Sequence, residues 1–152
     1  MGRMQGDMAY DLRCKQVIPS RTEELLGIRE IVENEALRFG FDPDTAFRLA
    51  LAVDEACTNI IKHSYANNPG QTFVIEIATT GDRFIIDLTD HGKHFDPGNM
   101  PKINMTHYLE QMRRGGLGVH IIQLVMDDVD YGVTSNHANR LRMVKYLKAA
   151  NS

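Results

Sequence analysis

The stretch that most constrains the fold is residues 42–65, which is apolar on nearly every side. A helix with that pattern belongs in the interior of a protein. Glu55, Asn59 and Lys62 interrupt the apolar run at spacings of four and three residues, with His63 beside them, which places them on one face of the helix. Because buried polar groups need partners, something outside the helix must pair with this polar stripe.

The composition is that of an ordinary globular domain. A chain of 152 residues, with 43% hydrophobic and 24% charged residues, is long enough for one domain with a sizeable core. The net charge is -3 and no Lys/Arg run extends beyond Arg113-Arg114, so nothing indicates nucleic acid as a partner. We expect one domain over residues 10–148, preceded by a disordered or tag-like segment over residues 1–9.

The cysteines and the apolar runs bear on cellular location. Cys14 and Cys57 form neither a disulfide framework nor a metal-binding spacing, which favours a reducing compartment. No apolar run approaches the length of a membrane span, and residues 1–9 contain no apolar segment typical of a signal peptide. The sequence therefore predicts a cytoplasmic protein that does not bind membranes.

Capping residues and periodicity predict the helices and strands. Ser20 and Glu23 form a capping box that predicts a helix ended by Gly40, and Asp42 followed by Pro43 predicts the start of the next helix. Strands are expected over residues 10–18, 73–77, 84–90, 128–133 and 140–147, and helices over 20–39, 42–65 and between 118 and 127. This order predicts an α+β fold with helices on one face of a mixed, mostly antiparallel sheet.

The segment 91–114 interrupts this regular pattern. It contains two Pro and two Gly, with one short helix expected over residues 106–112. An irregular segment of this length is usually functional and often forms a lid. The third long helix follows it, and we expect that helix to bury an apolar stripe made of Leu117, Ile121, Leu124 and Val125.

Asp90 stands where an apolar side chain is expected. It continues the alternation of Phe84, Ile86 and Leu88, so its carboxylate should point into the interior at the end of a strand, two residues before Gly92. A strand-end Asp often caps the turn that follows. The alternative is a carboxylate that accepts a hydrogen bond from a buried ligand amine, such as an adenine amino group.

The glycine run GGLG at residues 115–118 suggests an anion site, and the polar stripe suggests a cation site and a catalytic base. Backbone N–H groups at a loop-to-helix junction can bind an anion, although such a glycine run also serves as a hinge. It matches neither the dinucleotide-binding fingerprint nor a P-loop. An amide at Asn59 can hold a hard cation, and a carboxylate at Glu55 can deprotonate a hydroxyl; the alternative is a solvated stripe. His91, His94 and Asp96 lack the ligand spacing of a structural zinc site.

The order of these motifs resembles that of the GHKL ATPase superfamily. Its N-box is matched by EACTNIIKH at residues 55–63, and its two glycine boxes are matched by DHGKHFDP at 90–97 and GGLGVHII at 115–122. The first glycine box departs from many members at His94, where they carry a second glycine. Other features resemble the small stand-alone branch, the anti-sigma-factor serine/threonine kinases of bacterial partner-switching systems: PSR at 19–21, FDP at 95–97 and NRLRMVKYL at 139–147.

The resemblance implies a Bergerat-type ATP-binding sandwich of two layers that uses ATP and Mg²⁺. Asp90 would hold the adenine amino group, with Gly92 allowing close approach. Asn59 would bind the magnesium that bridges the ATP phosphates, and Glu55 would activate a serine or threonine hydroxyl on a partner protein. Further nucleotide contacts are implied for Lys62, His63, Phe95, Gly115, Gly116, Leu117 and Gly118.

The resulting hypothesis is an anti-sigma factor with kinase activity. By the resemblance, it would phosphorylate a STAS-type anti-sigma antagonist, sequester a sigma factor and form a homodimer. One alternative is a nucleotide-gated binding module that transfers no phosphate, which the presence of Glu55 disfavours. Another is the catalytic domain of a histidine kinase, which is disfavoured because residues 1–40 predict one helix and no phosphoacceptor helix pair.

Overall fold

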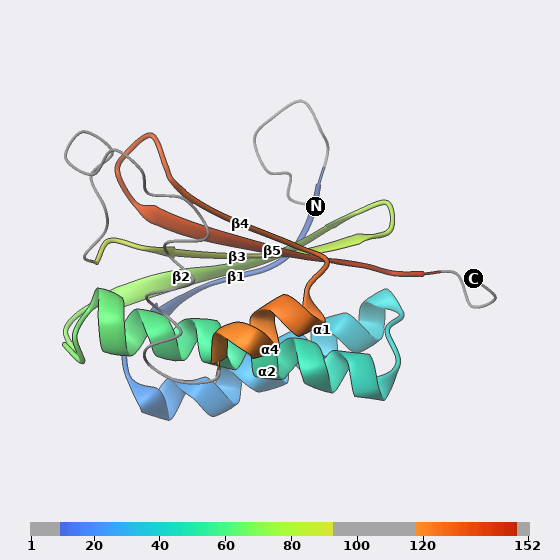
Figure 1. The fold of residues 1–152 in the computed structure, drawn as a ribbon, viewed down its shortest axis with the longest axis horizontal. Coiled ribbons are helices and arrows are strands. Elements are labelled where there is room, and N and C mark those ends of the chain that lie inside the picture. Colours follow the sequence, from blue (N-terminus) through green and yellow to red (C-terminus); the bar gives the residue numbers. More distant parts are fainter. Residues whose placement is uncertain (1–9, 93–117, 149–152) are drawn as a thin grey trace.

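The computed structural model describes residues 10–92 and 118–148, which form two layers, a sheet and a group of helices on one of its faces (Figure 1). The strands are β1 (Asp11–Pro19), β2 (Thr72–Thr80), β3 (Arg83–Asp90), β4 (Asp128–Val133) and β5 (Asn139–Tyr146). The helices are α1 (Leu25–Phe39), α2 (Pro43–Asn59) and α4 (Gly118–Val125), with a 3-10 turn, η1 (Thr22–Glu24), and a π turn, η2 (Ile60–Ser64). The predicted two-layer α+β architecture is confirmed.

The sheet has the strand order β1-β2-β3-β5-β4, and every neighbouring pair is antiparallel. The expectation of a mixed sheet is therefore wrong for the described strands. β3 and β4 run in the same direction, but β5 lies between them, so they do not become parallel neighbours. The β3–β5 register pairs Asp90 with Asn139, which brings the end of one strand beside the start of the other.

The core lies between the sheet and the helices. Alternate residues of β2 and β3 are at most 1% exposed, as their sequence pattern predicts: Phe73, Ile75, Ile77, Phe84, Ile86 and Leu88. The helices bury Ile28, Val32, Leu49, Val53 and Cys57 against the same core. Burial of each large apolar side chain contributes about 1.5–3 kcal/mol, so this layer of contacts holds the two faces together. Cys57 is a free, buried thiol.

The start of α1 differs from its prediction. Ser20 is not an N-cap, because its buried hydroxyl makes no hydrogen bond to any described residue; its backbone N–H donates to the carbonyl of Gln71 at 2.8 Å. The helical conformation begins with η1, whose N-cap residue Arg21 makes no capping hydrogen bond through its side chain. The capping box of Ser20 and Glu23 is therefore wrong, whereas Gly40 ends α1 as predicted, with a φ of 122°.

The start and end of the second helix agree with their predictions. Asp42 is the N-cap of α2, and its Oδ1 accepts a hydrogen bond from the Thr45 N–H at 2.9 Å. Pro43 is the first helical residue. The helix continues through η2 to Ser64, close to the expected end. Turns of the π type are often found at functional sites.

The third helix begins at the expected glycine, but its buried face is partly different. Ile122 and Met126 point into the core with 3% and 6% exposure, whereas Leu124 is 83% exposed, so the prediction for Leu124 is wrong. Ile121 and Val125 pack partly buried against the core. Leu117, the expected lid and the helix expected over 106–112 lie outside the described residues. Within residues 10–92 and 118–148, no helix is long and apolar enough to span a membrane.

Candidate functional site

Asp90 is a buried carboxylate at the end of β3. It is 4% exposed, and its Oδ1 accepts hydrogen bonds from the Gly92 N–H and the Asn139 amide, each at 2.9 Å. The Ser64 side chain also hydrogen-bonds this carboxylate. The predicted inward orientation is confirmed, and the bond from Gly92 shows that Asp90 also caps the following turn. Because a carboxylate has about four acceptor positions, these three donors leave room for a ligand amine.

Burial raises the pKa of Asp90 above its ordinary value, and the hydrogen bonds from Asn139, Gly92 and Ser64, together with the charge of His91, partly offset that effect. The cause is desolvation, which disfavours the charged form in the interior. A perturbed carboxylate held by specific donors, next to residues that line a pocket, is typical of a functional site.

Asn139 and Tyr131 complete the surroundings of Asp90, and sequence reasoning missed both. Asn139 is 2% exposed, and the Tyr131 hydroxyl donates to its Oδ1 at 2.9 Å. This bond turns the amide nitrogen of Asn139 toward Asp90. Burial raises the pKa of Tyr131 to about 12, so its hydroxyl remains a donor at neutral pH. No sequence pattern pairs residues 90 and 139; the signal is the strand register alone.

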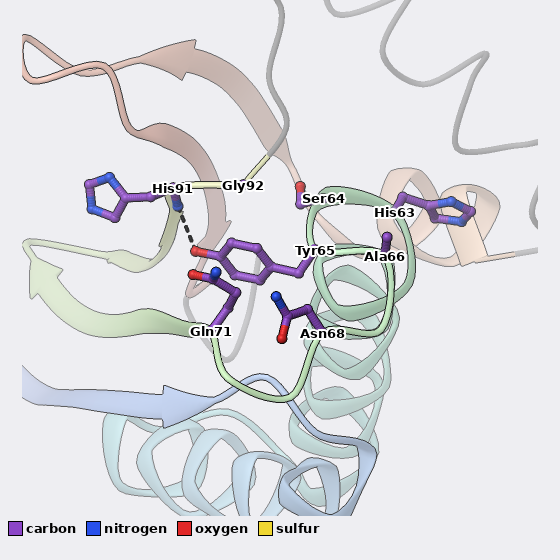
Figure 2. A pocket seen from close by; sticks show the side chains of 8 residues that line it. All are labelled: His63, Ser64, Tyr65, Ala66, Asn68, Gln71, His91 and Gly92. Atoms are coloured by element: carbon purple, nitrogen blue, oxygen red, sulfur yellow. Dashed lines mark hydrogen bonds between the residues drawn. The ribbon is translucent and has the colours of Figure 1, made fainter.

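Gly92 is required by a close approach between two backbones. A Cβ at this position would lie 2.6 Å from the carbonyl oxygen of Ser64, at the end of η2. A pocket of about 290 Å³ lies beside this contact (Figure 2), and its lining residues are His63, Ser64, Tyr65, Ala66, Asn68, Gln71, His91 and Gly92. The end of the second helix and the end of β3 therefore meet at one pocket.

The residues of the polar stripe on the second helix differ in their burial. Glu55 is half-buried, Asn59 is 8% exposed, and Lys62 and His63 are exposed at η2. The Asn59 amide makes no hydrogen bond to another residue that the structure describes. Its oxygen is therefore available to a ligand, whereas the simple picture of a fully solvated stripe does not hold for this residue.

Magnesium would have one protein ligand in the described part of the site. No group of three or more His, Cys, Asp or Glu among the described residues could hold a metal ion. Mg²⁺ is usually bound by one or two protein oxygens together with substrate phosphates and water, and the Asn59 amide oxygen fits that role. The residues present thus fit magnesium bound through a nucleotide.

The remaining predicted residues lie at the edge of the described chain or beyond it. Gly118 is the first residue of α4, so the glycine run does end at the start of a helix. Phe95, Gly115, Gly116 and Leu117 lie outside the described residues, as do His94 and Asp96. The part of the site described here is therefore the side formed by the second helix, β3 and β5.

Three comparisons with known proteins relate the chain to others. Residues 18–145 match the family of the histidine kinase-like ATPase domain. The serine-protein kinase RsbW of Bacillus cereus is 29% identical over 140 residues, which are 90% of this chain and 86% of that protein. RsbW of Bacillus subtilis is 30% identical over 135 residues, 86% of this chain and 82% of that protein. The SiaB-SiaC complex from Pseudomonas aeruginosa has a chain with the same fold, with a TM-score of 0.63, 18% identity, and coverage of 88% of this chain and 89% of that one.

Proposed function

Since the chain belongs to the histidine kinase-like ATPase domain family, we propose that it is a bacterial anti-sigma regulatory factor with serine/threonine kinase activity. The family agrees with the resemblance to the GHKL superfamily. The protein would use Mg-ATP to phosphorylate a STAS-type anti-sigma antagonist and would sequester a sigma factor, acting as a cytoplasmic homodimer. The observation that carries the proposal is that Gly92 and the buried Asp90 meet the end of the helix that carries Glu55 and Asn59.

Asp90 and Gly92 would form the floor under the purine base. The carboxylate accepts from an exocyclic amino group, and guanine presents a carbonyl there instead, so the site favours adenine. The absence of a side chain at Gly92 leaves the backbone of residues 90–92 close to Ser64 and open toward the pocket. These residues bind and orient the base.

Asn59 and Glu55 would act at the phosphate end of the site. When bound, Mg-ATP supplies the phosphoryl group that is transferred. The Asn59 amide oxygen is suited to the hard cation. Glu55 lies one helical turn before Asn59 and is half-buried, so its carboxylate can take the proton from a serine or threonine hydroxyl of the partner while that oxygen is oriented for attack.

The relatives support the hypothesis of a serine/threonine kinase over that of a histidine-kinase catalytic domain. Both RsbW proteins are named serine-protein kinases, and this chain aligns with more than four fifths of each. The complex of SiaB with SiaC supports a protein partner for this fold. A nucleotide-gated module that transfers no phosphate would bind the base through the same residues, Asp90 and Gly92. Glu55 is therefore the residue that distinguishes the two functions.

The test is a comparison of Glu55→Gln with the wild-type protein. Gln keeps the size of the side chain but cannot accept the hydroxyl proton, so we expect the rate of phosphate transfer from ATP to a STAS-type antagonist to fall about 10²–10⁴-fold. The Kd for ATP, measured by calorimetry, should stay within about twofold. Asp44→Asn is the matched control, because Asp44 is an exposed acid on the same helix that pairs only with Arg48 in the described residues.

Unchanged transfer by Glu55→Gln would contradict the role of this residue. ATP binding by the wild-type protein without any phosphoserine or phosphothreonine on the antagonist would favour the nucleotide-gated module instead. Absence of ATP binding would remove the basis for both functions.

A further inference from the structure

Tyr65 lies directly after the π turn that ends the second helix. Its backbone N–H donates to the carbonyl of Ile60 at 3.0 Å, the five-residue spacing of a π turn. A π turn has more residues than an α-helical turn and so changes the direction of the side chains that follow. The Tyr65 ring points toward the end of β3, at His91 (Figure 2), and the residue is 7% exposed.

The hydroxyl of Tyr65 connects the ends of two neighbouring strands. It accepts a hydrogen bond from the His91 N–H at 2.7 Å and donates to the carbonyl of Thr72 at 2.7 Å. Thr72 begins β2, and His91 directly follows Asp90 at the end of β3. Burial raises the pKa of Tyr65, so the hydroxyl keeps its proton at neutral pH and can make both bonds.

Ser64, the residue before Tyr65, contacts the same segment from its other end. Its carbonyl oxygen would lie 2.6 Å from a Cβ at Gly92, and its side chain hydrogen-bonds Asp90. In the segment from Asp90 to Gly92, Ser64 thus bonds the first residue and lies close against the last, and Tyr65 bonds the residue between them. The His91 side chain is exposed and is not packed in the interior. The Tyr65 hydroxyl therefore holds this position through the backbone N–H of His91.

We propose that Tyr65 is a positioning residue for the nucleotide base, because its hydroxyl fixes the backbone at His91 and thereby holds Asp90 and Gly92 in the arrangement that binds adenine. The inference rests on the proposed nucleotide site and adds a residue outside its sequence motifs. Without the hydroxyl, the His91 N–H and the Thr72 carbonyl lose a partner, and the segment gains freedom that ligand binding must remove.

The test is Tyr65→Phe, which removes one oxygen atom and keeps the ring. We expect the Kd for ADP and for ATP, measured by calorimetry, to rise by the same factor, roughly three- to tenfold, since of the two hydrogen bonds lost, the one to the His91 N–H lies at the base end. The KM for ATP should rise by that factor while kcat at saturating ATP stays unchanged. The amide proton of His91 should exchange faster with solvent in the variant.

Tyr146→Phe is the matched control. Tyr146 ends β5, whereas Asn139 begins that strand, so Tyr146 lies far from the pocket. Its hydroxyl donates to Asp128 in β4, and the loss of this bond should leave both Kd values unchanged. A lower melting temperature of Tyr65→Phe with unchanged Kd and KM would show a purely structural role and overturn the inference. A fall in kcat with unchanged KM would also overturn it. If the wild-type protein binds neither ADP nor ATP, the inference fails together with the proposed function; if only the variant comparison fails, the function stands.

Discussion

At the scale of single residues, Asp90 combines a structural and a binding role. Replacement by Asn keeps an oxygen that can accept from Gly92 and Asn139, so we expect the fold to persist. The NH₂ group of the new Asn is a hydrogen-bond donor and would oppose the purine amino group, which is also a donor. Nucleotide binding should therefore weaken at least about tenfold. Calorimetry with ADP measures this loss, and unchanged affinity would contradict the assignment of Asp90 to the base.

The same variant should change how stability depends on pH. The pKa of Asp90 is raised in the folded protein, so above the ordinary Asp value of about 3.9 the folded state holds a proton that the unfolded chain has released. Its contribution to the free energy of unfolding therefore falls as the pH rises from that value through the raised pKa. Because Asn cannot titrate, the free energy of unfolding of the variant does not include this decrease with rising pH.

Melting curves of Asp90→Asn and wild-type protein at several pH values measure that effect. The melting temperature of the variant relative to the wild type should be higher at neutral pH than near pH ~4. A difference that does not vary with pH would show that burial does not raise the pKa of Asp90.

The sequence could predict Asp90 but not its protein partners. Its place in the apolar alternation of β3 follows from a period of two residues, which is readable without a structure. The bond from Asn139 to Asp90 joins residues 49 positions apart, and the bond from the His91 N–H to the Tyr65 hydroxyl joins residues 26 positions apart. They depend on strand register and on a π turn, neither of which has a local sequence signal.

At the scale of elements, the contact between η2 and the end of β3 depends on Gly92. An added Cβ would meet backbone atoms of Ser64 that cannot move independently. Gly92→Ala should lower the free energy of unfolding by about 1–3 kcal/mol and weaken ATP binding. Gly27→Ala is the matched control: no atom lies within 4 Å of an added Cβ there, and alanine within α1 should stabilise by up to about 1 kcal/mol.

Urea denaturation and calorimetry of these two variants test the contact. Equal behaviour of Gly92→Ala and Gly27→Ala, in stability and in ATP binding, would show that the two backbones can separate without consequence.

The second helix also joins the layers through its apolar face. Leu49 is fully buried, and Leu49→Ala should lower the free energy of unfolding by about 2–5 kcal/mol. Phe47 lies two residues away and is 52% exposed, so Phe47→Ala should stay within about 0.5 kcal/mol. Urea denaturation checks both, and a larger effect at Phe47 would mean that this face of the helix is covered in solution.

Elements with strong local signals were predictable, and those decided by tertiary contacts were not. Asp42 and Pro43 mark the start of α2 because a cap and a fixed φ act locally. Ser20 matched a capping box equally well, yet its N–H bonds the carbonyl of Gln71 and its hydroxyl caps no described helix. Leu124 fitted a helical stripe, but the packing of α4 against α2 turned Ile122 and Met126 inward instead.

At the scale of the whole molecule, the two layers were predictable and the strand order was not. Early helices followed by paired strands indicate an α+β fold, because each helix must bury its apolar face on the sheet. The placement of β5 between β3 and β4 depends on long-range pairing, and it makes the described sheet wholly antiparallel. The same placement brings Asn139 to Asp90, so the order of the strands also builds the site.

The proposed function requires that this site transfer phosphate from ATP to a protein. The most direct measurement is mass spectrometry of a STAS-type antagonist after incubation with the wild-type protein, ATP and Mg²⁺. We expect one phosphoserine or phosphothreonine on the antagonist, which is absent when ATP is left out and strongly reduced with Glu55→Gln. An unmodified antagonist, in the presence of a protein that demonstrably binds ATP, would contradict it.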